Sequence, residues 1–524
     1  MKKPFFKKIS TILAAITLSV TCLAACGDDG SSSGGGKKAY TVDFYYPINA
    51  ISEPQDLAIV QTRLNEIVEP KIGATVKLHP IPIANYNNKM SVMINAGDKF
   101  DLCWTSSWMN NYYQNVDLDA FVALDDLLKE HAPTVWSQIP ENAWEGARVK
   151  GKIYGAIGLQ QLPRISGWSF DKTMLEGYMT ANNIKTEDLK TTFDSVESIT
   201  PYLAYVKANK TDAGEMLTDQ ISMSALQIFE GWDDIGGNTI PGVVSVYDDP
   251  TEINEDGNYV TVFNQFETAE YQNAMNTAKA WRDEGYTRRT PLETSYEIRK
   301  SYVNMLTTWK PDVYPLELAK VRTASTPDKD VVCVAASDPV YYNSYLVGNL
   351  IALSATSENY TASVKFLELM SSDKDVYNTL AFGIEGTHYK KSETNENRIE
   401  FLDAVVRYDM RKDSWMFGNQ FNSYLTDGMD DDVWEQTKAI NNATDVKYSP
   451  IVGFSFDISK VKVEIANCQK VYGDYDAPLM TGSNGDRTSA KYTEFLTKLK
   501  AAGVEKIIAE KQRQLNEWLA AKNK

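Results

Sequence analysis

The chain has 524 residues, of which 43% are hydrophobic, and a formal net charge of −17 at pH 7. Single cores stop growing well below this length, so we expect two lobes rather than one compact ball. The negative charge would repel phosphate backbones and anionic lipid headgroups, which excludes nucleic acid as a favoured partner and leaves no charge-driven attachment to membranes.

The first 25 residues have the pattern of a signal peptide. Four lysines among the first eight residues precede an uncharged run over 9–25 that is short for a membrane span. Residues 23–26, LAAC, resemble the lipobox of bacterial lipoproteins, which are cut before the cysteine and lipidated on its sulfur. Glycine, serine and aspartate fill 27–36, the composition of a flexible tether. We expect a signal peptide at 1–25, a lipidated Cys26 and a linker over 26–38; the alternative is a secretory signal with an incidental cysteine.

The segment after the linker alternates strand and helix patterns. YTVDFYYP at 40–47 is rich in β-branched and aromatic residues, and 53–70 place apolar residues at helical spacing. Residues 73–82 predict a second strand, 86–100 a second helix and 100–108 a third strand that runs into a loop. This alternation is typical of an α/β lobe with a mostly parallel sheet.

Residues at the ends of these strands are candidates for a binding site. Ligands of such sheets bind beyond the carboxyl ends of the strands. Tyr46, Thr105, Ser106 and Trp108 would therefore lie near a cleft, whereas Trp104, still inside the third strand, is expected in the core.

The sequence matches to catalytic and metal-binding motifs lack the neighbouring elements or residues that those motifs require. GSSSG at 30–34 matches a nucleophile elbow but lies in the linker, without the strand and helix that an elbow needs. In the calcium-loop-like stretch 252–263, Phe263 occupies the position of the required bidentate glutamate, so Asp256 and Gly257 indicate a hairpin turn. The three histidines lack metal-ligand spacing. We expect no catalysis, cofactor or metal, although acidic pairs brought together in three dimensions leave a surface glycosidase as an alternative.

Six stretches make the chain similar to a known family. In order they are MINAGDKFDLCW, LDAFVALDDLLKEHAP, VKGKIYGAIG, GWSFDKTMLEGY, the segment 349–389 and the segment 449–472. Together they resemble family 1 extracellular solute-binding proteins of ABC transporters, in the lipoprotein branch that ends in a C-terminal domain of unassigned function. The resemblance implies a two-lobed periplasmic-binding-protein fold of type II, a sugar or oligosaccharide ligand and a transporter permease as partner.

The same match implies where the chain passes between the lobes. It places three crossovers, able to absorb a hinge rotation, near residues 156–160, 344–352 and 383–388. Both lobes are then discontinuous in sequence. The first comprises 39–157 and 345–385, and the second comprises 158–344 and 386–524, including the family-specific C-terminal region.

A sugar ring packs its C–H face on an aromatic ring, and its hydroxyls need planar donors and acceptors. The chain has 11 Trp and 29 Tyr. The family carries a cleft aromatic where this chain has Trp309, and Trp168, Trp232 and Trp415 precede or lie in loops; Asn419 is a candidate hydroxyl partner. We expect a monomer, lipid-anchored on the outer face of a bacterial cell membrane, that delivers an oligosaccharide to an ABC importer. A peptide or another polar solute in the same fold is the alternative.

Overall fold

The computed structural model describes residues 39–211, 221–287, 302–306, 331–426 and 429–523. The predicted signal peptide, Cys26, the linker and Trp309 lie outside these ranges. Residues Tyr40–Lys524 form one compact unit. This unit has two large hydrophobic cores, each with its own sheet, which confirms the expected two-lobed α/β fold.

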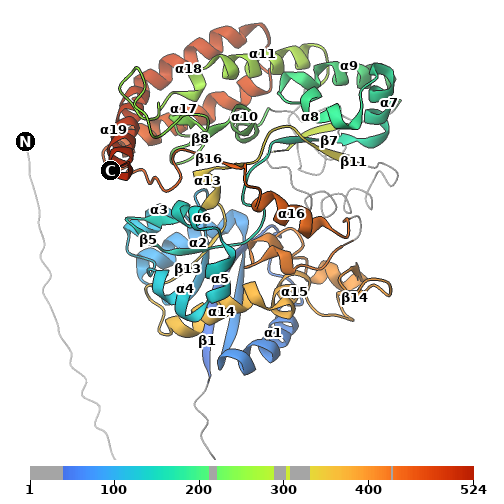
Figure 1. The fold of residues 1–524 in the computed structure, drawn as a ribbon, viewed down its shortest axis with the longest axis vertical. Coiled ribbons are helices and arrows are strands. Elements are labelled where there is room, and N and C mark those ends of the chain that lie inside the picture. Colours follow the sequence, from blue (N-terminus) through green and yellow to red (C-terminus); the bar gives the residue numbers. More distant parts are fainter. Residues whose placement is uncertain (1–38, 212–220, 288–301, 307–330, 427–428, 524) are drawn as a thin grey trace, which may run out of the picture. The chain divides into compact units, whose positions relative to one another are not determined.

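The first lobe is an α/β layer structure (Figure 1). Its main strands are β1 (Tyr40–Ile48), β2 (Ala74–Pro82), β3 (Leu102–Thr105), β6 (Gly155–Ile157) and β13 (Leu350–Leu353). Its helices are α1 (Leu57–Ile72), α2 (Ile83–Ala96), α3 (Tyr112–Asp117), α4 (Asp125–His131), α5 (Pro133–Gln138), α6 (Glu141–Gly146), α14 (Tyr360–Ser372) and α15 (Lys374–Phe382). The sheet order is β2-β1-β3-β13-β6; the first three strands are parallel, and β13 is antiparallel to both of its neighbours.

Apolar spacing explains the first two elements. β1 buries Val42 and Phe44 completely on one face, at the two-residue period of a strand. α1 buries residues at three- and four-residue intervals, namely Leu57, Val60, Leu64 and Val68. Gly73 ends α1 in the left-handed region, with φ of 68°, and its N–H donates to the Glu69 carbonyl at 2.9 Å.

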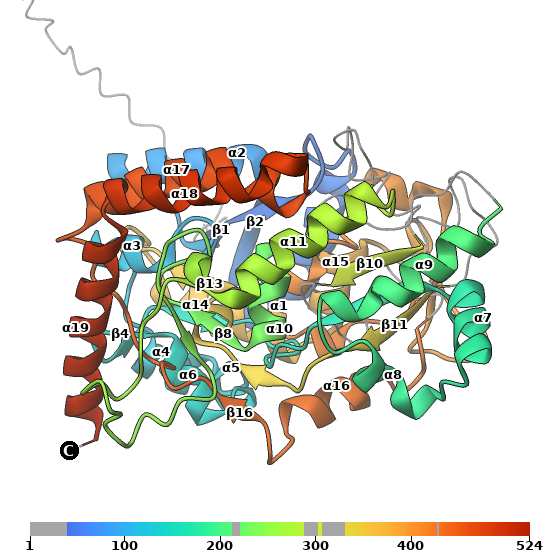
Figure 2. The same ribbon diagram turned by 90° about the horizontal axis from the view of Figure 1, so that it is seen from above.

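The second lobe combines small sheets with long helices (Figure 2). Its strands are β7 (Gly167–Asp171), β10 (Val303–Leu306) and β11 (Val331–Ala335), in the antiparallel order β10-β7-β11, and a hairpin of β8 (Trp232–Asp234) and β9 (Val243–Ser245). Its helices include α7 (Lys172–Asn182), α8 (Leu189–Thr192), α9 (Thr200–Asn209), α10 (Met223–Glu230), α11 (Ala269–Asp283), α17 (Lys462–Met480), α18 (Thr488–Ala502) and α19 (Val504–Lys522). α17 and α18 lie side by side, and α19 turns away after Gly503.

Three connections between the lobes meet in one narrow ribbon. Arg164 on the first exchanges two backbone hydrogen bonds with Val340 on the second, at 2.7 and 3.0 Å. The second, as β12 (Val340–Tyr341), pairs in parallel with the third, β16 (Lys447–Tyr448). The Tyr341 and Tyr448 rings stack at 4.4 Å with an interplanar angle of 4°. A hinge rotation would have to act through this ribbon.

The third crossover lies far beyond the expected position at 383–388. Residues 389–424 contribute Tyr389, Ile399, Tyr408 and Phe417 to the core of the first lobe, so 386–425 do not belong to the second lobe. His388 is fully buried, and its Nε2 lies 3.2 Å from Asp56 Oδ2 at the start of α1. Sequence pattern could not predict this, because the segment holds only a short hairpin and 3-10 turns, and its isolated buried side chains show no periodicity.

Candidate functional site

A cavity of about 1110 Å³ lies between the two lobes. Pockets for drug-sized ligands typically measure about 300–1,000 Å³, so this cleft suits a ligand of more than one ring. The first lobe lines it with residues that include Trp108, Asn111, Tyr113, Gln114, Arg411 and Trp415. The second lobe and the crossovers line it with residues that include Gln160, Gln161, Gln227, Trp232, Asn238, Asn343 and Tyr345.

Two tryptophans of the first lobe form an aromatic wall around a third. Trp104 is fully buried in β3 as expected, and its ring meets Trp108 edge-on at 5.2 Å and Trp415 at 6.0 Å. Trp104 Nε1 donates to Asn349 Oδ1 at 2.9 Å, and Asn349 Nδ2 donates to the Trp415 carbonyl at 2.8 Å. The buried indole and one amide therefore hold both cleft rings in place.

Trp108 presents the larger free surface. Its side chain is 55% exposed, and Nε1 donates to the Gly348 carbonyl at 3.1 Å. The turn that carries it is fixed by Ser106, whose Oγ accepts the N–H groups of Trp108 at 3.3 Å and of Met109 at 2.9 Å. An exposed ring held on a rigid turn is suited to stacking on the C–H face of a sugar.

The wall from the second lobe starts at Trp232, at the beginning of β8. Its ring is only 6% exposed and packs against Phe263 at 5.7 Å. The following loop, 236–240, lines the cleft and is held from inside the lobe. Gly237 N–H donates to Asp234 Oδ1 at 2.7 Å, and Gln265 Nε2 donates to the Ile240 carbonyl at 3.2 Å.

The C-terminal helix α19 holds the two residues that directly follow this loop. Lys511 of α19 is fully buried, and its Nζ donates to the carbonyls of Pro241 at 2.7 Å and Gly242 at 3.1 Å. Gly242 has φ of 110°, and an added Cβ would lie 2.7 Å from Lys511 Cδ, so the lysine stem occupies the space beside it. Burial lowers the pKa of Lys511 to about 7, and the nearby Asp234 opposes that shift.

Asp233 joins β8 to the second crossover. Its carboxylate accepts the N–H of Asn343 at 2.7 Å and the Oγ–H of Ser344 at 2.9 Å, both in α13 (Asn343–Leu346). Burial, with a contribution from Asp234, raises the pKa of Asp233 to about 7. The cleft wall and the hinge ribbon are thus directly hydrogen-bonded.

Amide side chains dominate the polar lining, and the charged residues that also line the cleft are Asp117, Arg164, Asp234, Arg411 and Lys412. Arg411 forms a bidentate pair with Asp409, at 2.8 and 3.0 Å. Of the carboxylates that line the cleft, Asp117 pairs with Lys150 at 2.8 Å and Asp234 is bound by the loop. Planar amides offer a donor and an acceptor on one plane, as adjacent sugar hydroxyls require. The arrangement can bind a neutral polyhydroxylated ligand.

The nine predicted site residues separate into distinct groups. Trp108, Trp232 and Trp415 line the cleft from both lobes, and ligand contact by them stays a prediction. Trp309 lies outside the described residues. Asn419 lines a different cavity behind the first crossover.

Four predicted site residues are instead structural. Tyr46 is fully buried in the first core, because β1 continues to Ile48, beyond the predicted strand end. Thr105 and Ser106 are also buried, and they bond within the turn that carries Trp108. Trp168 is fully buried in β7, with Nε1 donating to the Phe193 carbonyl at 3.0 Å. None of these four residues lines the cleft.

The cleft amides were missed by sequence reasoning. Gln160 and Gln161 lie on the first crossover and line the cleft directly, as do Gln227 and Asn238 in the second lobe. The two adjacent glutamines at a predicted hinge were the sequence feature that could have indicated these amides.

Among the helices of the described ranges, none is long and apolar enough to span a membrane.

Comparisons with known proteins agree with this architecture. Residues 450–520 match a family model described as a domain of unknown function, DUF3502. The chain is 24% identical over 531 residues to a carbohydrate ABC transporter substrate-binding protein of Streptococcus pneumoniae serotype 4, covering 99% of both chains. The crystal structure of the N-glycan transport solute-binding protein NgtS from Streptococcus pneumoniae is 23% identical, with a TM-score of 0.76, covering 92% of this chain and 100% of that one.

A more distant structure has the same architecture. A solute-binding protein from Bifidobacterium longum infantis, described as HMO-binding and ABC-transporter-associated, is 12% identical with a TM-score of 0.57, over 92% of this chain and 100% of that one. These likenesses confirm the fold of ABC-transporter solute-binding proteins and the resemblance inferred from the sequence, including its C-terminal region.

Proposed function

We propose that this protein captures an oligosaccharide in the cleft between its lobes and delivers it to the permease of an ABC importer. The observation that carries the proposal is the lining of the cleft. Trp108 and Trp415 line it from one lobe, and Trp232 and several amides line it from the other. Rings supply stacking surfaces, and amides supply hydroxyl partners.

The ligands of similar proteins suggest the first probes. Crystal structures of NgtS include complexes with Man1GlcNAc and with Man5GlcNAc. The cavity of about 1110 Å³ also favours several rings over one. An oligosaccharide of mannose and N-acetylglucosamine is therefore the substrate class to test first.

Titration calorimetry of the mature protein with Man5GlcNAc tests the function, followed by mass analysis of the recovered sugar. A binding protein gives saturable heat and returns the sugar intact. A shortened sugar would identify a glycosidase instead. Binding of peptides, with no response to any oligosaccharide, would favour the same fold with another solute.

Attachment to the membrane through a lipid on Cys26 is part of the proposal. Replacing Cys26 with serine should move nearly all of the protein from the membrane fraction to the medium, because no other anchor is expected and buried acyl methylenes supply the binding. The measurement is a blot of the two fractions. Cys22→Ser is the matched control, since that residue leaves with the predicted signal peptide. Equal membrane retention of both variants would show that another feature holds the protein.

Closure of the lobes around the ligand is a further part of the proposal. A ligand held by both walls contacts them fully only in a closed state. It can drive closure only by the difference between its affinities for the closed and the open state. We expect a smaller radius of gyration in small-angle scattering with saturating sugar. We also expect stabilisation of about 2.7 kcal/mol at a ligand concentration near 100 Kd. Stabilisation without any change in the radius would indicate a preformed, static cleft.

A further inference from the structure

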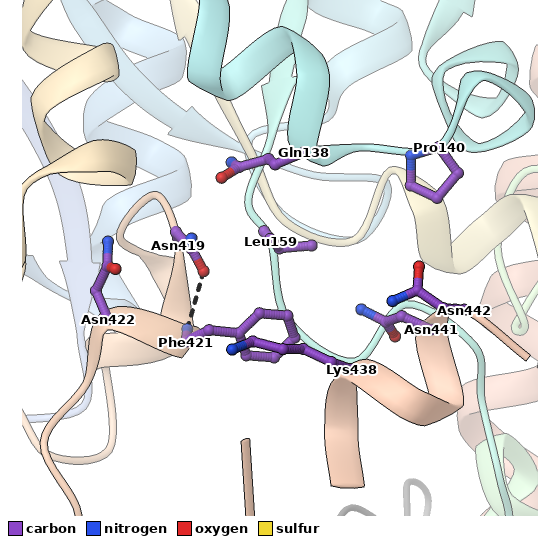
Figure 3. A pocket seen from close by; sticks show the side chains of 9 residues that line it. All are labelled: Gln138, Pro140, Leu159, Asn419, Phe421, Asn422, Lys438, Asn441 and Asn442. Atoms are coloured by element: carbon purple, nitrogen blue, oxygen red, sulfur yellow. Dashed lines mark hydrogen bonds between the residues drawn. The ribbon is translucent and has the colours of Figure 1, made fainter. Parts of the chain in front are cut away.

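A second cavity, of about 280 Å³, lies behind the first crossover (Figure 3). Of the residues that the structure describes, none lines both this cavity and the interlobe cleft. Its lining consists of Gln138, Pro140, Leu159, Asn419, Phe421, Asn422, Lys438, Asn441 and Asn442. The last three come from α16 (Val433–Asn441) and the residue that follows it.

Two paired backbone segments separate the two cavities. Leu159 N–H donates to the Gly418 carbonyl at 2.7 Å, and Gln420 N–H donates to the Leu159 carbonyl at 2.8 Å. Leu159 and Asn419 line the rear cavity, whereas the next residues, Gln160 and Gln420, line the cleft. Alternation along extended backbone thus turns successive side chains toward two different spaces.

The rear cavity contains one amide group that has no partner among the described residues. Neither Oε1 nor Nε2 of Gln138, at the end of α5, has a hydrogen-bond partner among the described residues, although both atoms are shielded from solvent. Asn419 Oδ1 accepts the Phe421 N–H at 2.9 Å, shown dashed in Figure 3, and Asn422 Nδ2 donates to the Ser371 carbonyl at 2.8 Å. The other ends of these two amides are not among the buried atoms without a partner, so among the described lining residues Gln138 alone is both shielded and unpaired. A buried amide left unpaired destabilises a fold unless something else pairs with it.

The remaining lining restricts the chemistry of what could bind. Among the described residues no carboxylate lines the cavity, and the Lys438 ammonium lies above the Phe421 ring at 5.6 Å and near Glu435 at 3.9 Å. Pro140, Leu159 and Phe421 add apolar surface. The volume falls just below the range of about 300–1,000 Å³ for drug-sized ligands, which is the scale of one ring.

From these observations we propose that the rear cavity binds a single neutral sugar ring, with Gln138, Asn419 and Asn422 bonding its hydroxyls. Asn441 connects this site to the hinge, because its Nδ2 donates to the Gln160 carbonyl at 2.7 Å and its Oδ1 accepts the Leu162 N–H at 2.9 Å. The site is independent of the oligosaccharide proposed for the cleft.

Saturation-transfer NMR on the mature protein tests this site with glucose, mannose and N-acetylglucosamine as separate probes. We expect signal for at least one of them, with a dissociation constant on the order of millimolar. Gln138→Leu should abolish the signal without lowering the melting temperature, because the amide it removes has no protein partner. Asn442→Trp, at an exposed rim position, should block entry and serves if the first variant misfolds.

Trp108→Ala separates this cavity from the cleft. The proposal requires that Trp108→Ala keeps the monosaccharide signal while Gln138→Leu and Asn442→Trp lose it. Loss in Trp108→Ala alone would place the monosaccharide in the cleft and overturn the proposal. Absence of signal from all three probes with the wild-type protein would mean that the cavity holds water only, and would overturn it equally.

Discussion

Replacing Trp108 with alanine is expected to weaken oligosaccharide binding by about 1–3 kcal/mol, roughly 5- to 150-fold in Kd. Trp108 is 55% exposed on a fixed turn of the cleft wall, so much of its ring is available to a ligand although the ring also packs against the buried Trp104 at 5.2 Å. Its one hydrogen bond, to the Gly348 carbonyl, contributes modestly to the fold. Calorimetry with the tightest oligosaccharide found for the wild type measures the loss.

Two variants make this result interpretable. Trp108→Phe keeps a smaller ring at the same place and should recover part of the affinity. Tyr360→Ala removes an aromatic side chain that is 36% exposed at the start of α14, outside the cleft lining, and should leave affinity unchanged. Wild-type affinity in Trp108→Ala would show that the ring does not contact the ligand, and an equal loss in Tyr360→Ala would point to a general effect on the fold.

The sequence predicted the elements of the first lobe well because local pattern determines them. Strand and helix periods alternate clearly up to the third strand, and the exposed Trp108 follows directly from the end of that strand. Trp168 shows the limit of the same reasoning. It stands near predicted loop sequence, yet β7 is the central strand of its sheet, and contacts from distant parts of the chain bury the ring.

The remaining site residues depend on contacts between segments far apart in sequence. The third crossover could not be placed because the segment 386–425 is anchored by single side chains such as Tyr408 and Phe417. Likewise, the resemblance gave the C-terminal region no role. The structure shows that it lines the cleft with Phe456, Ile458 and Gln469 and supports a cleft loop through Lys511.

Lys511→Met should destabilise the fold by about 1–3 kcal/mol at neutral pH and weaken ligand binding. The carbonyls of Pro241 and Gly242 lose their buried donor, and the loop 236–240 loses its support. The expected loss is not larger at this pH, because methionine also removes the cost of burying an ammonium group. Denaturant unfolding followed by fluorescence measures the change. Lys506→Met on the same helix, where the lysine is exposed and pairs with Glu464, is the matched control and should cost less than about 1 kcal/mol.

The pH dependence makes the test specific to this buried lysine. Burial lowers the pKa of Lys511 from its ordinary 10.5 to about 7, against the attraction of the facing Asp234 and Cys468. Between these two values the unfolded chain holds the proton that the folded chain has released. Wild-type stability from this group therefore rises with pH across that window, by up to about 1.4 kcal/mol per unit. Lys511→Met lacks the rise, so its deficit relative to wild type should be larger near about pH 9 than at neutral pH, whereas Lys506→Met should follow the wild type. A deficit that stays constant with pH would mean that Lys511 titrates normally and that its two carbonyl bonds alone support the loop.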